Sequence, residues 1–308
     1  MPKWIPERPV YKRERRTVSV MVLAAFLLLL VSRLTAHLLP FSHTLWLVAP
    51  ALAGVAFLLP VGGYLLFRGR GYVKNLRFQL PRAAHIPLLI FAFISLFCGS
   101  FLLSMLTGGL DALGNNVAAF SQNTPKTVWE FLLSLLSVGV LPAILEAIFF
   151  HGIVAAEYER RGAYRAILMS TLLFALVHFD ITNLLAYLYA GALLMLVLFA
   201  TNSLLATMLL HVAYQVLSLL AHTYLVALYR FTGTVQLFLF IFLVLLLLSL
   251  ILFCRSAMRI YRTRDEHGIS NPRRDVPYNV QFYTVLDAVS DPAFIFCVIV
   301  SVVGFILF

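Results

Sequence analysis

Nine long apolar runs divide this sequence, and each is close to the length of a helix that crosses a membrane. About 20 apolar residues in a helix span the roughly 30 Å of hydrocarbon in a bilayer. The runs cover 17–39, 45–67, 86–106, 128–156, 163–179, 184–200, 203–229, 235–254 and 292–308. With 62% hydrophobic residues, 12% charged residues and a mean hydropathy of +0.94, the composition excludes an ordinary soluble domain. We predict an all-α, polytopic, integral membrane protein of eight to nine transmembrane helices.

Basic residues alternate between the connections and predict the orientation. The N-terminal tail, the second connection, the fourth connection and the connection before the last helix carry six, five, three and six of the 23 Lys and Arg residues. The positive-inside rule places these segments in the cytoplasm, with the N-terminus inside and, for nine helices, the C-terminus outside. The net charge of +10 is explained by this topology and by contact with anionic membrane lipid. A nucleic-acid partner is not needed.

The chain divides into one membrane domain with basic segments at its edges. We expect a basic cytoplasmic tail at 1–16, a membrane domain at 17–254, a basic cytoplasmic loop at 255–291 and a final transmembrane helix at 292–308. The first run has no small-residue cleavage site after it, so we interpret it as a permanent helix. Cys98, Cys254 and Cys297 lie in apolar runs without CxxC spacing, which favours small buried hydrophobic residues over a disulfide or metal site.

Three ionisable residues in the apolar runs are the candidates for function. Glu146 is the one acidic residue deep inside a run, and His178 and His211 have similar surroundings. A charged side chain at the bilayer centre costs about 2.5 to 3.5 kcal/mol on insertion scales, so such residues are usually functional. Pro142, four residues before Glu146, frees a backbone carbonyl and should bend the helix near the acid.

The three candidates can lie at one depth. Glu146 comes 14 residues before Arg160, His178 comes 13 after Arg165, and His211 comes 8 after Ser203. At 1.5 Å per residue these spacings correspond to depths of roughly 12 to 21 Å from the cytoplasmic face. A polar stripe also follows helical spacing along the run 203–229. It consists of Thr207, His211, Tyr214, Gln215, Ser218 and His222.

In order along the chain, these residues resemble the motifs of the CAAX protease and bacteriocin-processing family of intramembrane peptidases, also called CPBP or Abi proteins. That family has Glu-Glu-x-x-x-Arg on one helix, Phe-x-x-x-His on the next and His-x-x-x-Asn two helices on. The matching residues here are Glu146, Ala147 and His151, then Phe174 and His178, then His211 and Gln215. The resemblance covers about residues 128–222, and it departs from the family at Ala147, His151 and Gln215.

The resemblance implies hydrolysis of a peptide bond in a membrane-associated or prenylated-type peptide or protein substrate. It implies that Glu146 and His178 activate water and that His211 and Gln215 hold the oxyanion, with His151, Phe174 and Tyr214 in supporting positions. The family type also suggests a bacterial plasma membrane. The chemistry agrees, because a carboxyl and an imidazole can take a proton from water and pass it to a leaving amine. Residues one turn apart, such as His211 and Gln215, can direct donors at one oxygen.

Other interpretations remain open. A catalytically inactive relative that binds a partner or confers immunity would keep the same fold, and buried histidines also serve as hydrogen-bonding contacts between helices. A proton-coupled transporter would need paired discontinuous helices, for which Pro142 has no counterpart. Glu146, His178 and His211 would be a three-ligand set for zinc, but the chain lacks His-Glu-x-x-His spacing, so we favour a metal-free mechanism without a cofactor.

The other histidines are interpreted as structural. His151 lies five residues after Glu146, about 140° around an α-helix, so we expect it to face elsewhere, as a packing residue or a substitute for the missing arginine. His222 lies towards the outer face. The rest sit at interfaces or in loops without metal-ligand spacing: His37, His43, His85 and His267.

Overall fold

The computed structural model describes residues 8–38, 45–69, 72–73, 76–108, 127–160, 162–266 and 278–308, and this part of the chain is all helical. It forms 11 helices, of which the one over 128–159 is continuous but changes its winding along its length. That helix comprises α5 (Val128–Ser134), η4 (Leu135–Val140), α6 (Leu141–Glu146), η5 (Ala147–Val154) and α7 (Ala155–Glu159). The others are α1 (Arg8–Leu38), α2 (Leu45–Arg68), α3 (Ile86–Gly108), α8 (Ala163–Leu176), α9 (Leu184–Thr201), α10 (Leu204–Leu220), α11 (His222–Thr232), α12 (Val235–Glu266), α13 (Tyr278–Val289) and α14 (Pro292–Leu307).

The described helices include five that are long and apolar enough to cross a membrane, or seven if two bent pairs each form one span. The bent pairs are Leu204–Leu220 with Tyr224–Thr232, at 63°, and Phe282–Val289 with Pro292–Leu307, at 61°. Gly54–Arg68 and Ala163–Leu176 are shorter apolar helices. The protein is therefore an all-α, multi-pass membrane protein, as predicted. The count differs from the nine predicted spans because two of the nine runs form bent pairs and two others, Gly54–Arg68 and Ala163–Leu176, are shorter apolar helices in the part of the chain that the structure describes.

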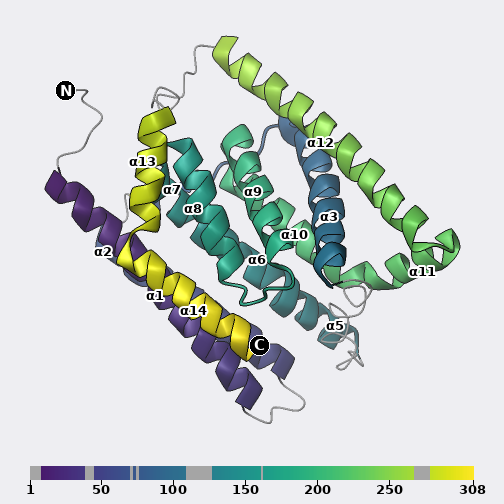
Figure 1. Ribbon diagram of the computed structural model, residues 1–308, viewed down its shortest axis with the longest axis horizontal. Coiled ribbons are helices and arrows are strands. Elements are labelled where there is room, and N and C mark those ends of the chain that lie inside the picture. The colour runs from purple at the N-terminus through teal and green to yellow at the C-terminus, as the bar shows by residue number, and fades with distance from the viewer. Residues whose placement is uncertain are drawn as a thin grey trace.

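The helices that carry the candidate residues occupy the middle of the molecule (Figure 1). In this view α8, α9 and α10 lie between two outer groups of helices, with α1, α2 and α14 along one side and α3 and α12 along the other. Helix α14 packs along α1 and also contacts α8. Side chains far apart in the sequence therefore meet at the central helices.

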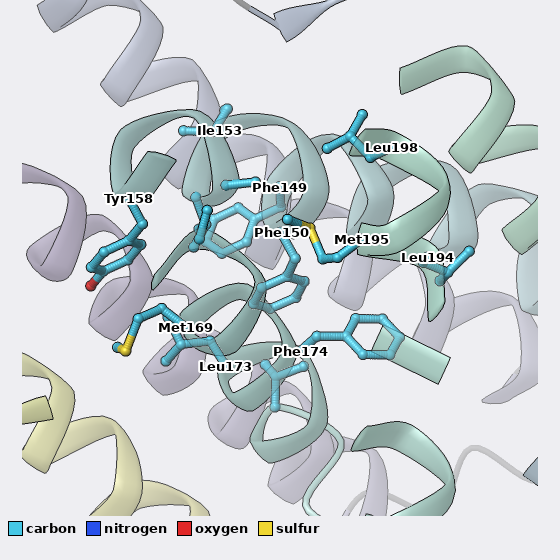
Figure 2. Close-up of a cluster of buried hydrophobic side chains, with 14 of the residues drawn as sticks. Phe149, Phe150, Ile153, Tyr158, Met169, Leu173, Phe174, Leu194, Met195 and Leu198 are labelled. Carbon is cyan, nitrogen blue, oxygen red and sulfur yellow. The ribbon is translucent and has the colours of Figure 1, made fainter. Parts of the chain in front are cut away.

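A dense apolar core fixes these central helices against one another. Figure 2 shows Phe149, Phe150 and Ile153 of η5 beside Leu173 and Phe174 of α8, with residues of α9 opposite. The first three are fully buried. Because such interiors pack like organic crystals, a shift of one of these helices would require the others to move. The core gives η5, α8 and α9 a defined relative position.

Polar side chains define the ends of several helices. Thr127 accepts a hydrogen bond from the Glu130 N–H, and Ser203 accepts one from the Ala206 N–H, which caps the first turns of the 128–159 helix and of α10. Asp291 caps α14 in the same way, and Pro292 occupies the first helical position, where its missing N–H has no cost. These three predicted helix starts therefore have a local chemical cause.

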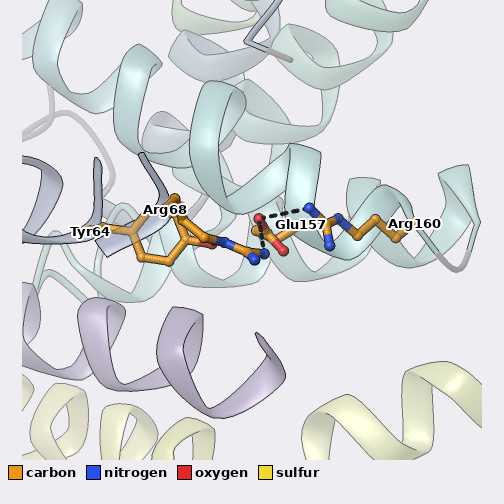
Figure 3. Close-up of polar contacts among 4 residues, drawn as sticks. All are labelled: Tyr64, Arg68, Glu157 and Arg160. Carbon is orange, nitrogen blue, oxygen red and sulfur yellow. Dashed lines mark hydrogen bonds and ion pairs between the residues drawn. The ribbon is translucent and has the colours of Figure 1, made fainter. Parts of the chain in front are cut away.

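Ion pairs join the end of α2, and the connection that follows it, to the end of α7. Arg68 pairs with Glu157 at 2.7 Å, and Arg160 reaches the same carboxylate at 3.4 Å (Figure 3). Arg77 contacts both carboxylate oxygens of Glu159, at 2.5 and 2.6 Å. The carbonyl of Arg77 also accepts from the Leu204 N–H. This connection thereby ties α7 to the start of α10.

The segment predicted as a basic loop at 255–291 is helical over much of its length. Helix α12 continues to Glu266, beyond the predicted end of its apolar run at Cys254, and α13 covers Tyr278–Val289. The apolar pattern ends where the helix leaves hydrocarbon, but arginine is a good helix former, so the helix itself does not end there. Residues 1–7 of the predicted basic tail lie outside the described residues.

We predict that Arg77→Met destabilises the protein, because it leaves the Glu159 carboxylate, whose side chain is 3% exposed, without this partner. Breaking such a pair costs about 3 to 5 kcal/mol. The thermal midpoint in detergent should fall by more than about 5 °C. Arg160→Met is the matched control, since its side chain is 39% exposed and its pair is longer, and it should change the midpoint little. Equal effects of the two variants would contradict this assignment.

Candidate active site

Glu146 lies between two π-helical segments of the long 128–159 helix. η4 precedes α6, and η5 begins at Ala147. Within η4 the winding is widened, and the Leu141 N–H donates to the Leu136 carbonyl, five residues back. Pro142 has no N–H and its ring clashes with the carbonyl four residues earlier, which such a widening relieves. The proline was expected to bend the helix, and beside it the structure shows a change of winding. π-bulges of this kind are frequent at functional sites.

Three predicted site residues converge on one carboxylate oxygen. Nε2 of His211 lies 3.7 Å from Oε2 of Glu146, and Nε2 of His178 lies 3.9 Å from the same oxygen. Glu146 is 9% exposed and His211 1% exposed. Both distances exceed hydrogen-bond length. The three side chains therefore meet, as a shared depth requires.

The Phe174 ring is the packing centre of this cluster. Its centroid lies 4.9 Å from that of His178 and 5.6 Å from that of His211. Across the ring, α9 contributes Gly191, where an added Cβ would lie 2.9 Å from Cδ1 of Phe174. Figure 2 shows Phe174 between α8 and the residues of α9. The phenylalanine of the Phe-x-x-x-His motif therefore sets the spacing between the two histidines.

His178 is oriented by two further contacts. Its Nδ1–H donates to the Phe174 carbonyl at 2.7 Å, because a carbonyl oxygen can only accept. In the neutral ring, Nε2 then carries the lone pair and faces Glu146. The ring also stacks on Tyr187 of α9, with centroids 3.9 Å apart and planes at 16°. Both the direction and the tautomer of the imidazole are thereby determined.

His151 lies nearer the site than the sequence indicated. The expected angle of 140° from Glu146 assumes α-helical winding, but the intervening turn is π-helical, and this brings residues five apart towards one side. The His151 ring lies 5.3 Å from that of Phe174, and its Nδ1 lies 3.4 Å from the Ser170 hydroxyl. His151 is a packing residue, one of the two alternatives expected from the sequence, and it packs against the same aromatic ring as the two site histidines.

The other predicted residues are less closely involved. Gln215 is half-buried one turn after His211, and within the described ranges no hydrogen bond or ion pair joins it to Glu146 or to either histidine. Tyr214 packs against the main apolar core. The side chain of His222 lies outside the described residues. The oxyanion role of Gln215 therefore stays a prediction.

The structure does not arrange a metal centre from these ligands. Among the described side chains, no three His, Cys, Asp or Glu residues are placed to hold a metal ion together. The site is described as a carboxylate facing two imidazoles.

Sequence reasoning missed the residues that surround the histidines from neighbouring helices. Tyr187 and Gly191 are four residues apart on α9, so both face the site, but an apolar helix gives no reason to single them out. Asp180 accepts hydrogen bonds from Asn183 at 2.8 Å and from the Tyr187 hydroxyl at 3.4 Å. Arg33 interacts electrostatically with Glu146 and Asp180. In the sequence, Arg33 stands out only because it lies outside the basic connections.

A multi-pass helical membrane protein with a buried carboxylate facing two histidines belongs to the class of candidate intramembrane hydrolases. Residues 128–217 match the family described as type II CAAX prenyl endopeptidase Rce1-like. This part of the chain is a domain of the Rce1-like CPBP family, a family of CAAX proteases, as the motifs indicated. Comparison with curated proteins and with solved structures gives no match.

We predict that Glu146→Gln leaves the thermal midpoint in detergent unchanged or raises it. Oε2 of Glu146 is buried and makes no hydrogen bond among the described residues, so no hydrogen bond offsets the cost of burying this oxygen. An amide of the same shape removes the cost of a buried charge. A clear fall in the midpoint would show that the carboxylate is a structural partner of the histidines, and this would contradict its assignment to the chemistry.

Proposed function

We propose that this protein is an intramembrane endopeptidase that hydrolyses a peptide bond of a membrane-associated or prenylated-type substrate. The observation that carries the proposal is the convergence of His178 and His211 on Oε2 of Glu146, within 3.9 and 3.7 Å. Support also comes from the family of residues 128–217, whose members are CAAX proteases. Membership in a fold does not establish an activity, whereas the geometry of a site can support one.

The geometry supports water activation by Glu146 and His178. Groups 3.9 Å apart are too distant for a direct hydrogen bond but close enough for one water to contact both. In this mechanism the carboxylate takes a proton as the water oxygen attacks the scissile carbonyl. The lone pair on Nε2 of His178 faces the position of the same water. The proton then passes to the leaving amine as the C–N bond breaks.

His211 is the group we assign to the oxyanion. Its Nε2 lies 3.7 Å from Oε2 of Glu146, and its ring packs edge to face against that of Phe174. A donor placed where negative charge develops contributes about 10²- to 10³-fold to the rate. Gln215, four residues further along α10, supplies a second donor if its amide turns towards the substrate. Its stem is one methylene longer than that of the family asparagine.

A second function, an inactive relative that binds a membrane partner, is favoured by one observation. The second glutamate and the arginine of the family motif are replaced by Ala147 and His151, which are 0% and 1% exposed. Both family charges are absent together, so no buried carboxylate is left unpaired at this position. The fold is thus compatible with either a catalytically active or an inactive site.

The proposed topology places the N-terminus and the basic connections in the cytoplasm, with nine crossings. We expect single cysteines at positions 70, 161 and 264 to react with a membrane-impermeant thiol reagent only from the cytoplasmic side. Cysteines at positions 42, 121 and 232 should react only from outside. The background requires replacement of Cys98, Cys254 and Cys297. Labelling of positions 121 and 161 from the same side would contradict a single crossing between them.

We predict that Glu146→Gln, His178→Ala and His211→Ala each abolish cleavage of a membrane-bound peptide reporter by the purified protein. Because the three groups act together, double variants should be no slower than single ones. Gln215→Ala should cost about 10²- to 10³-fold in rate. His85→Ala removes a buried histidine outside the site and is the control that should keep full activity. Full activity of Glu146→Gln would exclude its role as the base.

A further inference from the structure

Phe179, the residue directly after His178, has an unusual backbone conformation. Its φ is +48°, in the left-handed region that large side chains rarely adopt. Helices often end with one such residue, but that residue is usually glycine because it has no Cβ. Here a phenylalanine adopts such a conformation three residues after the last residue of α8, with its side chain 1% exposed. Such a conformation persists only where the surroundings determine it.

The surroundings of Phe179 come from α1 and α14. The Phe26 ring of α1 meets the Phe179 ring edge to face, with centroids 6.1 Å apart. The Arg33 guanidinium, also on α1, lies 5.7 Å from the same ring and 6.0 Å from the ring of Phe308. On α14, Gly304 lies so close that an added Cβ would be 2.5 Å from Cδ1 of Phe179 and 2.8 Å from its Cβ. Phe179 is thus enclosed on two sides.

Both helices lie outside residues 128–217, the part of the chain that belongs to the protease family. Figure 1 shows α14 lying along α1, beside the end of α8. Within the domain, the His178 ring contacts Phe174, Tyr187 and Glu146. The backbone amides of residues 178 and 179 donate hydrogen bonds of 3.4 Å to carbonyls in the last turn of α8. The Phe179 ring adds contacts with α1 and α14 to these.

We propose that α1 and α14 form a clamp on Phe179 that positions His178 against Glu146. In this clamp Phe26, Arg33 and Gly304 are positioning residues, and the strained backbone of Phe179 transmits their packing to the adjacent imidazole. The catalytic consequence rests on the proposed function. The structural consequence, the placement of the His178 ring, does not depend on it.

The first experiment compares Gly304→Ala with Gly63→Ala. Both replace a helical glycine by alanine, but a Cβ at position 63 has nothing within 4 Å. We expect Gly304→Ala to lower kcat at least 10-fold with KM changed less than 2-fold, because the histidine moves while the substrate-binding surface does not. Gly63→Ala should keep both constants. Unchanged kcat in Gly304→Ala would overturn the clamp.

A second variant separates the clamp from a simple helix end. Phe179→Gly suits the left-handed backbone better than phenylalanine does, so a residue that only ends α8 would tolerate it. If the ring positions His178, Phe179→Gly should instead lower kcat at least 10-fold. Gly304→Ala should then add nothing in the Phe179→Gly background, because the side chain with which its Cβ collides is gone. Full activity of Phe179→Gly, or additive losses, would contradict the proposal.

A measurement without turnover distinguishes failure of the clamp from failure of the protease assignment. In detergent-solubilised protein carrying isotope-labelled histidine, the resonance lost in His178→Ala identifies the imidazole. This resonance should shift in Gly304→Ala and in Phe179→Gly but not in Gly63→Ala. A shift in a protein that cleaves no peptide would support the clamp and reject the proposed protease. An unmoved resonance would reject the clamp, whatever the activity.

Discussion

The packing of one aromatic ring, Phe174, determines how the rest of the site is arranged. The ring meets His151 of η5, His178 in the turn after α8, and His211 of α10. In hydrocarbon no hydrophobic force pulls helices together, so they associate through close packing. A small residue on one helix lets a large side chain of the neighbouring helix approach closely. Gly191 provides that space on α9. The positions of the polar groups follow from this apolar contact.

The fold class and the three central residues could be predicted because both reflect the free-energy cost of placing polar groups in a membrane. Long apolar runs have few alternatives to a membrane helix, and Glu146 is expensive enough in such a run to require a reason. The depth of each group followed from the constant rise of a helix. What surrounds the histidines could not be predicted in this way. Tyr187 and Gly191 look like ordinary members of an apolar helix, and only the crossing of α8 and α9 gives them their roles.

His151 shows where periodicity fails. An angle computed from 3.6 residues per turn is correct only while the helix keeps that winding, and the segment after Glu146 does not. Pro142 explains the widened winding of η4, but the sequence contains no comparably clear cause for the widened winding of η5. A buried histidine at the position of the family arginine keeps a ring of suitable size against Phe174 and brings no obligatory charge. The substitution therefore preserves packing while removing an ion pair that would need a partner.

The boundary of the protease domain does not coincide with the boundary of its site. Residues 128–217 supply the carboxylate and both imidazoles, whereas the conformation after His178 is enclosed by α1 and α14. A strained backbone beside a functional group is stable only when packing on every side opposes its relaxation. Helices from opposite ends of the chain must therefore be in place before the imidazole is. This requirement gives the helices outside the domain a role in the chemistry that membrane insertion alone would not demand.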